Sequence, residues 1–299
     1  MRAHRVFPAA VAAVLLAVTG CSGSGPPAPA KDTVRFAAYD FIENQILVAV
    51  YAEAARRAGV PVSVESGVAT REVTEPALEQ GVVDVVVDYL GTASRFLGRP
   101  AAGAPETPEQ ARAGLGQALA GRGVTVLDPA PAEDQNGFAV TTAFAAAHRV
   151  GTLTQLARLA PGLVFGGPPE CADRPLCLPG LRRTYGMTFR EVRTMPSRAA
   201  TVEALAAGEI DVGLLETTDA RVGNAPVLLL LDDRSLQPHE NVVPLVRTAV
   251  VERWGPTLRT ALDGVSKRLT TPGLVQLNRS VEIDGLTPAQ AAAHWWDAQ

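Results

Sequence analysis

Short apolar runs alternate with amphipathic stretches along most of this chain. The run from Val34 to Ala38 predicts a buried strand, and the segment from Asn44 to Ala58 carries apolar residues at helical spacing. Gly59 follows that segment, as is common at the end of a helix. The alternation continues with strands predicted at 62–64 and 82–87 and a helix ending at 80. This order is typical of a largely parallel sheet covered by helices on both faces, with ligands at the carboxyl ends of the strands.

A second unit of the same kind follows. Its predicted elements are strands at 138–141, 163–165, 212–215 and 227–231 and helices at 153–159 and 200–207. The chain then returns through an apolar segment at 242–246, and helical segments follow. The two units share a joint, a glycine-ended helix followed by a strand that opens with aspartate, at 77–85 and 204–212. We therefore predict an α/β fold of two lobes, with crossings near 134–138 and 240–247 and a ligand cleft between the lobes.

The first residues carry a different pattern. Arg2 and Arg5 precede an apolar run that ends at Val18, and Cys21 follows after Thr-Gly. This order resembles a bacterial lipoprotein signal, which predicts lipidation of Cys21 and a body held at the outer face of the cell membrane. The alternative is a short buried helix with an incidental cysteine. The Ser-, Gly- and Pro-rich residues that follow favour a flexible tether, so we expect a signal at 1–20 and a tether at 21–31.

Charge and cysteine content narrow the possible partners. The chain has a formal net charge of -4, and loss of residues 1–20 would make the body more acidic. A mildly acidic body without a basic run argues against nucleic acid as a partner. Cys171 and Cys177 stand six residues apart in a Pro-rich stretch. In an oxidising compartment we expect them to form a local disulfide, since a metal site would need two more ligands and the four histidines are scattered.

Motifs of catalysis are missing from the sequence. It contains no Gly-x-Ser-x-Gly elbow, no His-Glu-x-x-His helix and no Gly-x-x-x-x-Gly-Lys phosphate loop, and its body offers no third cysteine as nucleophile. We predict a binding protein without cofactor or metal, not an enzyme. A tethered sensory or cell-wall-binding module is the other class that this organisation allows.

Several short phrases follow one another in the order of a known family. They are Phe41–Leu47, Arg71–Leu78, Asp88–Ala93, Pro179–Leu181, Tyr185–Gly186, Thr217–Asp219, Leu231–Asp233, Asn241–Pro244 and Leu277–Arg279. With them the chain resembles the substrate-binding proteins of ABC importers for glycine betaine, choline and related osmoprotectants. The resemblance implies a monomeric, two-lobed periplasmic-binding-protein fold (type II-like) that closes on a solute, without catalysis, and delivers it to permease and ATPase subunits. We place one lobe at 32–135 plus 245–299 and the other at 136–244.

The resemblance also assigns site residues. Tyr89 and Phe138 correspond to two positions of the family's aromatic cage, and Thr92 lines the same pocket. Arg174 corresponds to the carboxylate-binding arginine, and Asn136 is a polar residue beside the cage. The plainer alternatives are core aromatics at strand ends for Tyr89 and Phe138, and a solvated loop residue for Arg174.

Three departures from the family pattern bear on the ligand. Tyr39 stands where the family usually has lysine or glutamine, and it is a candidate for an extra aromatic face. Glu216 and Glu240 replace tyrosines of the best-known betaine and choline binders. Carboxylates in the cage would favour a less shielded cation or another solute, such as an ergothioneine-like compound, an amino acid-like zwitterion or a polyamine. Alternatively, Glu216 forms a salt bridge between the lobes and Glu240 points away from the cleft.

Overall fold

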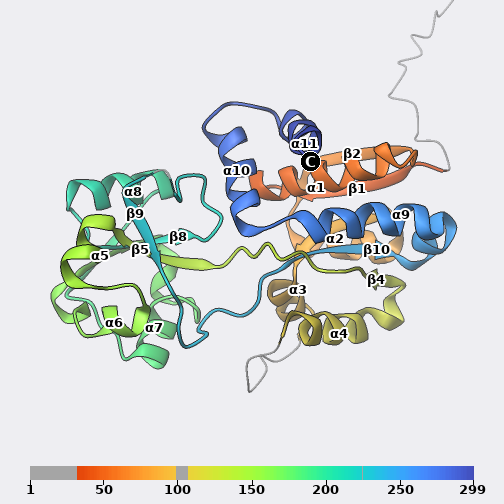
Figure 1. Ribbon diagram of the computed structural model, residues 1–299. Helices are drawn as coiled ribbons and strands as arrows, with labels where there is room; N and C mark the ends of the chain where they lie inside the picture. Colours follow the sequence, from red (N-terminus) through yellow and green to blue (C-terminus); the bar gives the residue numbers. More distant parts are fainter. Residues whose placement is uncertain (1–31, 99–106, 224) are drawn as a thin grey trace, which may run out of the picture. The chain divides into compact units, whose positions relative to one another are not determined.

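The computed structural model describes residues 32–98, 107–223 and 225–299, so the predicted signal, tether and Cys21 lie outside the described residues. Two five-stranded sheets organise this part of the chain (Figure 1). The first sheet has the order β2-β1-β3-β10-β4, from β1 (Val34–Tyr39), β2 (Val62–Ala69), β3 (Val85–Tyr89), β4 (Val124–Val126) and β10 (Val242–Arg247). β1 is parallel to β2 and β3, whereas β10 is antiparallel to both β3 and β4. β10 alone thus runs against the other four strands, so the sheet is largely parallel as predicted, with one antiparallel strand.

Helices cover both faces of the first sheet (Figure 1). One face packs against α1 (Ile42–Arg57), α9 (Thr248–Arg268), α10 (Thr271–Glu282) and α11 (Pro288–Asp297), and the other against α2 (Arg71–Gln80), α3 (Leu90–Phe96) and α4 (Pro108–Leu119). Successive residues of β1 point to opposite faces, so Phe36 belongs to the first core and Ala37 to the second. We call this sheet with its helices the first lobe.

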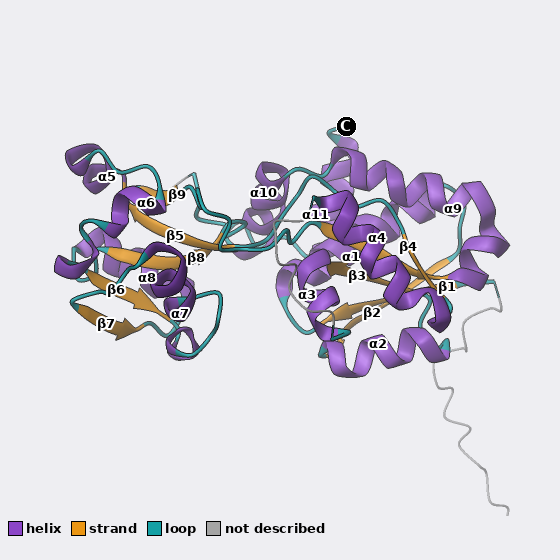
Figure 2. Ribbon diagram, turned by 90° about the horizontal axis from the view of Figure 1, so that it is seen from below, coloured by secondary structure: helices purple, strands orange, loops and turns teal. Residues whose placement is uncertain are grey.

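The second sheet has the order β7-β6-β8-β5-β9, which can be followed in Figure 2. Its strands are β5 (Asn136–Thr141), β6 (Val164–Gly167), β7 (Glu191–Thr194), β8 (Val212–Glu216) and β9 (Val227–Leu230). The core on one face includes α5 (Thr142–His148), α6 (Leu153–Ala157) and α7 (Leu178–Tyr185), and the core on the other includes α8 (Arg198–Ala207). β5 is antiparallel to both neighbours, so this sheet has an antiparallel strand as well. We call it, with its helices, the second lobe.

A glycine turn delays the start of β3. Gly81 ends α2 with φ at 74°, in the left-handed region that favours glycine. The next backbone N–H groups, of Val82 and Val83, still bond to the carbonyl of Ala77, and Val82 is 59% exposed. The strand therefore begins at Val85, three residues later than predicted.

The chain passes between the sheets twice, within 127–135 and within 231–241. The two passages meet at a bridge between Glu133 and Asn241. β10 joins the first sheet from its first residue, where Val242 pairs with Tyr89. The strand thus spans the predicted lobe boundary at 244/245.

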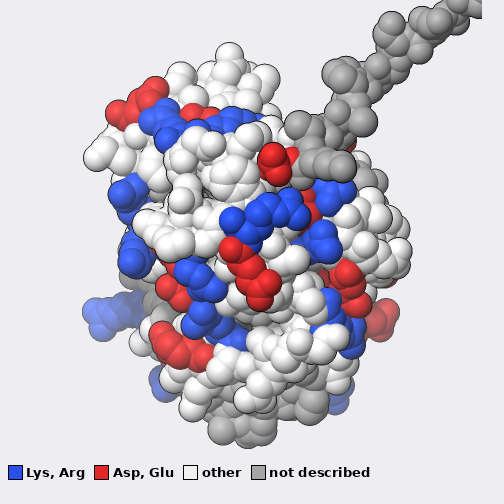
Figure 3. All heavy atoms as spheres, turned by 90° about the vertical axis from the view of Figure 1, so that its right-hand side faces the viewer, with Lys and Arg blue, Asp and Glu red and all other residues white. Residues whose placement is uncertain are grey.

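On the face drawn in Figure 3, basic and acidic side chains are interspersed. Among the described residues, none of the helices is long and apolar enough to cross a membrane. The same residues contain no group of three or more potential metal ligands.

Candidate binding site

Three aromatic rings form a row where β1 and β3 end. Tyr39 is the last residue of β1 and Tyr89 the last of β3. The ring of Phe41, the residue before α1, stacks on both, with centroids 6.0 Å from Tyr39 and 6.4 Å from Tyr89. Phe41 is 41% exposed, whereas both tyrosines are buried. Phe41, which the sequence analysis did not assign to the site, is thus the ring of this row that a solute can reach.

Tyr39 is surrounded by charged side chains. Its hydroxyl donates to Oδ2 of Asp88 at 2.9 Å, and the guanidinium of Arg71 lies 4.9 Å from its ring centre. Arg71 also forms a bidentate ion pair with the fully buried carboxylate of Asp88, at 2.8 and 2.5 Å. The ring of Tyr39 already has Arg71 and Phe41 as neighbours, so it supports Phe41 more than it offers a face of its own.

Tyr89 begins a network of hydrogen bonds between the two lobes. Its hydroxyl donates to Oε1 of Glu43 at 2.6 Å, and Nδ2 of Asn278 donates to Oε2 of Glu43 at 2.6 Å. The same nitrogen donates to the carbonyl of Thr218 at 2.9 Å, and the Thr218 hydroxyl donates to Oδ1 of Asp134 at 2.9 Å. Two acidic residues from different parts of the chain, Glu43 and Asp134, thus belong to one network.

Glu240 is engaged at the start of α3. Its carboxylate accepts the backbone N–H of Thr92 at 2.8 Å and the Thr92 hydroxyl at 3.0 Å, and Arg95 pairs with it at 2.5 Å. Burial raises the pKa of Glu240, although Arg95 favours its charged form. A Cβ on Gly91 would lie 2.9 Å from Oε1 of Glu240, so this approach requires glycine. Both carboxylate oxygens of Glu240 therefore accept hydrogen bonds from residues of α3.

Glu216 is paired within the second lobe. Arg198 binds its carboxylate with two nitrogens, Nε at 2.6 Å and the closer Nη2. A bidentate guanidinium neutralises most of the negative charge that this glutamate would present to a cation. The salt bridge is between α8 and β8 of one lobe, not between the lobes.

The remaining second-lobe candidates have different surroundings. Phe138 is 2% exposed, and its ring centre is 6.4 Å from that of Phe165 in the core. Asn136 donates to Oε1 of Gln237 at 3.2 Å and pairs in register with Glu216 across β5 and β8. Asn136 and Glu216 therefore lie at the same end of the second sheet.

Arg174 belongs to a loop that is closed by the disulfide between Cys171 and Cys177, whose Cα atoms are 5.2 Å apart. Its side chain is 65% exposed and lies 3.5 Å from Glu170. The structure thus brings Tyr39, Tyr89, Thr92 and Glu240 to one edge of the first sheet and leaves Arg174 outside that group.

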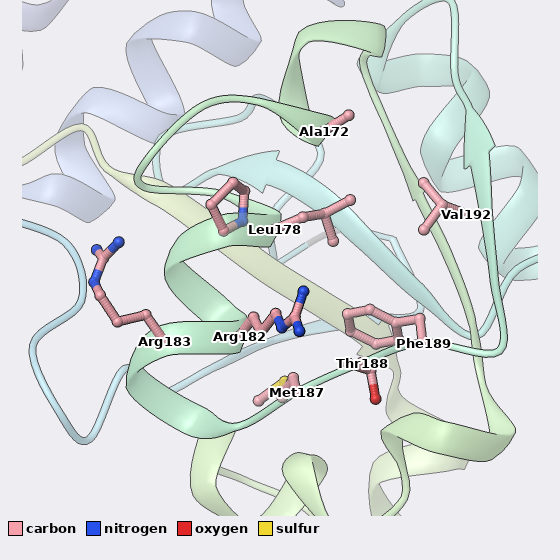
Figure 4. A pocket seen from close by; sticks show the side chains of 9 residues that line it. Ala172, Leu178, Arg182, Arg183, Met187, Thr188, Phe189 and Val192 are labelled. Carbon is pink, nitrogen blue, oxygen red and sulfur yellow. The ribbon is translucent and has the colours of Figure 1, made fainter.

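A separate hollow of about 650 Å³ opens on the second lobe beside α7 (Figure 4). Apolar side chains and two arginines surround it. The lining residues are Ala172, Leu178, Pro179, Arg182, Arg183, Met187, Thr188, Phe189 and Val192. None of the site residues predicted from the sequence lines this hollow, so we do not assign the solute to it.

Comparison with known proteins identifies relatives of this chain. A family model described as the substrate binding domain of ABC-type glycine betaine transport systems matches residues 32–298. The glycine-betaine-binding protein of Pseudomonas aeruginosa is 28% identical over 88% of this chain and 86% of its own length. The glycine betaine-binding protein YehZ of Escherichia coli is 24% identical over 90% of this chain and 91% of its own.

Solved structures confirm the predicted fold. The crystal structure of a glycine betaine/carnitine/choline ABC transporter protein superimposes with a TM-score of 0.79 at 22% identity, over 89% of this chain and 98% of the other. The two-lobed α/β binding-protein fold expected from the sequence is therefore correct.

Proposed function

This chain belongs to the family of substrate-binding domains of ABC-type glycine betaine transport systems, and we propose that it binds a quaternary ammonium solute of the glycine betaine or choline class. The family is one of transport proteins that bind solutes, not a class of enzymes. The observation that carries the choice of solute is the exposed ring of Phe41, stacked on Tyr89 beside the carboxyl group of Glu43.

A quaternary ammonium group has no N–H to donate, so a site must hold it by other means. Aromatic faces attract such a cation with about 0.5 to 2 kcal/mol each, most strongly when water is excluded. Phe41 supplies the exposed ring, the buried ring of Tyr89 stacks behind it, and the hydrogen bond from Tyr89 to Glu43 holds an acidic group beside this pair of rings. Rings and acid together suit a cation that cannot hydrogen-bond.

Residues of the second lobe complete the site in this proposal. Asn136 and Glu216 lie at one end of its sheet, and Phe138 lies in the core behind them. Closure of the lobes around the solute would bring Asn136 and Glu216 to the rings of the first lobe, with hinges in the two passages between the sheets. Arg174 stays a candidate for binding the other end of the ligand. Glu240 stays a candidate site residue through its contacts with Thr92.

The cellular setting follows from the start of the sequence. Basic residues, an apolar run and Cys21 in that order support export and lipidation at this cysteine. We propose an extracytoplasmic, lipid-anchored monomer whose liganded form is recognised by a membrane permease with its ATPase.

Calorimetric titration and thermal unfolding of the purified chain test the solute class. The probes are choline, glycine betaine, carnitine and the neutral isostere of choline in which carbon replaces nitrogen. A ligand bound only by the folded state raises the melting temperature. We expect a rise with the quaternary ammonium compounds and none with the isostere. A response to a polyamine or an amino acid, with none to any quaternary ammonium, would overturn the proposal.

A further inference from the structure

Glu43 and Asp134, two acidic side chains near Tyr89, form no salt bridge with a lysine or arginine of the described ranges. Other acids of the region are paired, Asp88 with Arg71, Glu240 with Arg95 and Glu216 with Arg198. Glu43 and Asp134 instead bond to neutral groups, and no described lysine or arginine forms a salt bridge with either. No described lysine or arginine therefore competes with a ligand for either carboxyl group.

Asn278 has a buried side-chain oxygen without a hydrogen-bond partner among the described residues. It is 3% exposed, and its Nδ2 holds both Glu43 and the carbonyl of Thr218. Its Oδ1 is buried and finds no hydrogen-bond partner in the described part of the chain. An unpartnered buried acceptor next to a carboxyl group is costly unless a ligand compensates it. Oδ1 of Asn278 is thus an acceptor that suits a positively charged ligand.

The two acids influence each other. Burial raises the pKa of Glu43 above its usual range, against hydrogen bonds from Tyr89 and Asn278, and the charge of Glu216 acts in the same direction as burial. Burial also raises the pKa of Asp134, reinforced by the charges of Glu43 and Glu216. The charge of one buried carboxylate disfavours ionisation of another nearby, so the second group ionises more readily when a positive charge is bound beside it.

We propose that Glu43 and Asp134 are the anionic partners of the bound cation, that one of them gives up a proton when the cation binds, and that they make the site prefer a solute with net positive charge to a zwitterion. This inference rests on the proposed function and specifies its solute as choline-like. The balance is simple: the protonated pair plus the cation gives the ionised pair with the cation bound, and one proton passes to solvent. A carboxylate on the ligand would add repulsion next to the same two acids.

Several other titratable, charged or polar groups lie near Glu43 and Asp134. They are Asp88 and Tyr89 from β3, Asn278 and Glu282 from α10, Thr218, Asp219 and Arg221 after β8, Glu216 with Arg198, and Glu240 with Arg95. The arginines among them pair with Glu216, Glu240, Asp219 and Glu282. Burial also raises the pKa of Glu282, so a flatter pH profile in Glu43→Gln and Asp134→Asn is what attributes the proton to the pair.

The test compares choline and glycine betaine on the wild-type protein and on Glu43→Gln and Asp134→Asn, each checked for folding by circular dichroism. We expect choline to bind more tightly as the pH rises through the raised pKa values of the pair and to release a proton, measured by calorimetry in buffers of different ionisation enthalpy. Each variant should lose about tenfold in choline affinity and less than about threefold in glycine betaine affinity, with a flatter pH profile. Glu72→Gln, an exposed acid on α2, is the control and should change neither.

The outcomes separate the two proposals. Equal loss of both solutes in both variants, or choline binding without pH dependence or proton release, would refute the role of the pair and leave the solute class intact. Failure of the wild-type protein to bind any quaternary ammonium compound would refute the proposed function and this inference together.

Discussion

The guanidinium of Arg71 lies 4.9 Å from the centre of the Tyr39 ring. It is held there by a bidentate ion pair with Asp88, which also accepts the Tyr39 hydroxyl. A ring with a cation already near its face has little attraction left for a second one. Tyr39 therefore backs Phe41, whose ring is the exposed member of the row.

Replacement of Phe41 should weaken solute binding. Phe41→Ala removes the exposed aromatic face, and we expect about tenfold lower affinity for choline by calorimetry. Phe41→Leu, the matched control, keeps apolar volume without a π face and should lose nearly as much. Tyr39→Phe keeps the supporting ring, so its affinity should stay within about twofold while its stability falls by about 1 kcal/mol from the lost hydrogen bond. Wild-type affinity in Phe41→Leu would show that apolar contact, not cation attraction, holds the solute.

Apolar periodicity predicted much of the fold because buried segments leave a clear pattern. The α1 and β8 segments were found within about two residues of their observed bounds. The direction of a strand was harder to predict, because an apolar run such as 242–246 does not indicate whether it lies parallel or antiparallel to its neighbours. β10 runs antiparallel because the chain re-enters the first sheet beside Tyr89 and continues away from it.

Side-chain partners were harder to predict than strands. Glu216 and Glu240 occur where the family has aromatic residues, and the sequence left open whether they face the ligand. Each has an arginine on an adjoining helix, Arg198 and Arg95, whose placement depends on the folded chain. Phe41 could have been found, because an aromatic residue that immediately follows a strand and precedes a helix lies at the ligand-binding edge of such a sheet.

Replacement of Arg174 tests whether this arginine binds the carboxylate of a ligand. Its side chain is 65% exposed beside Glu170, on the loop closed by the disulfide. We expect Arg174→Ala to leave choline affinity within about twofold of wild type, since choline has no carboxylate for a guanidinium to bind. If Arg174 binds the ligand carboxylate, as the resemblance to the family implies, the same variant should lose tenfold or more in affinity for glycine betaine, measured by calorimetry. Arg190→Ala, another exposed arginine of this lobe, controls for net charge, and a choline defect specific to Arg174→Ala would contradict this prediction.

Loss of the disulfide should destabilise the chain. Cys171 and Cys177 close a short loop, for which loop-closure entropy gives about 2 kcal/mol. We expect Cys171→Ala/Cys177→Ala to lower the free energy of unfolding by about this amount in chemical denaturation. A reducing agent should lower wild-type stability similarly and leave the double variant unchanged. An unaltered wild-type midpoint under reduction would show that the bond contributes nothing to stability.

Glu75 gives the stability of this protein a pH dependence of predictable sign. It is 3% exposed, and its Oε2 has no hydrogen-bond partner in the described residues. Burial and the charge of Asp88 raise its pKa to about 8, against the favourable charge of Arg71. The single proton of the Tyr39 hydroxyl goes to Asp88 at 2.9 Å, so the longer contact of 3.4 Å to Glu75 suits a protonated carboxyl group that donates to the phenol oxygen.

A carboxyl group whose pKa is higher in the folded than in the unfolded state makes stability fall as pH rises between the two values. Glu75→Gln mimics the protonated form, so its advantage over wild type should grow from about pH 4.5 to about pH 8, reach roughly 2 to 4 kcal/mol and then level off. Denaturant unfolding at a series of pH values measures this difference. Glu72→Gln on the same helix is the control: a hydrogen bond from Thr70 lowers the pKa of Glu72, so its ionisation favours the folded state throughout this range and its difference from wild type should stay constant. A constant difference for Glu75→Gln across this range would mean that Glu75 is ionised throughout, and that Arg71 is then shared between two carboxylates.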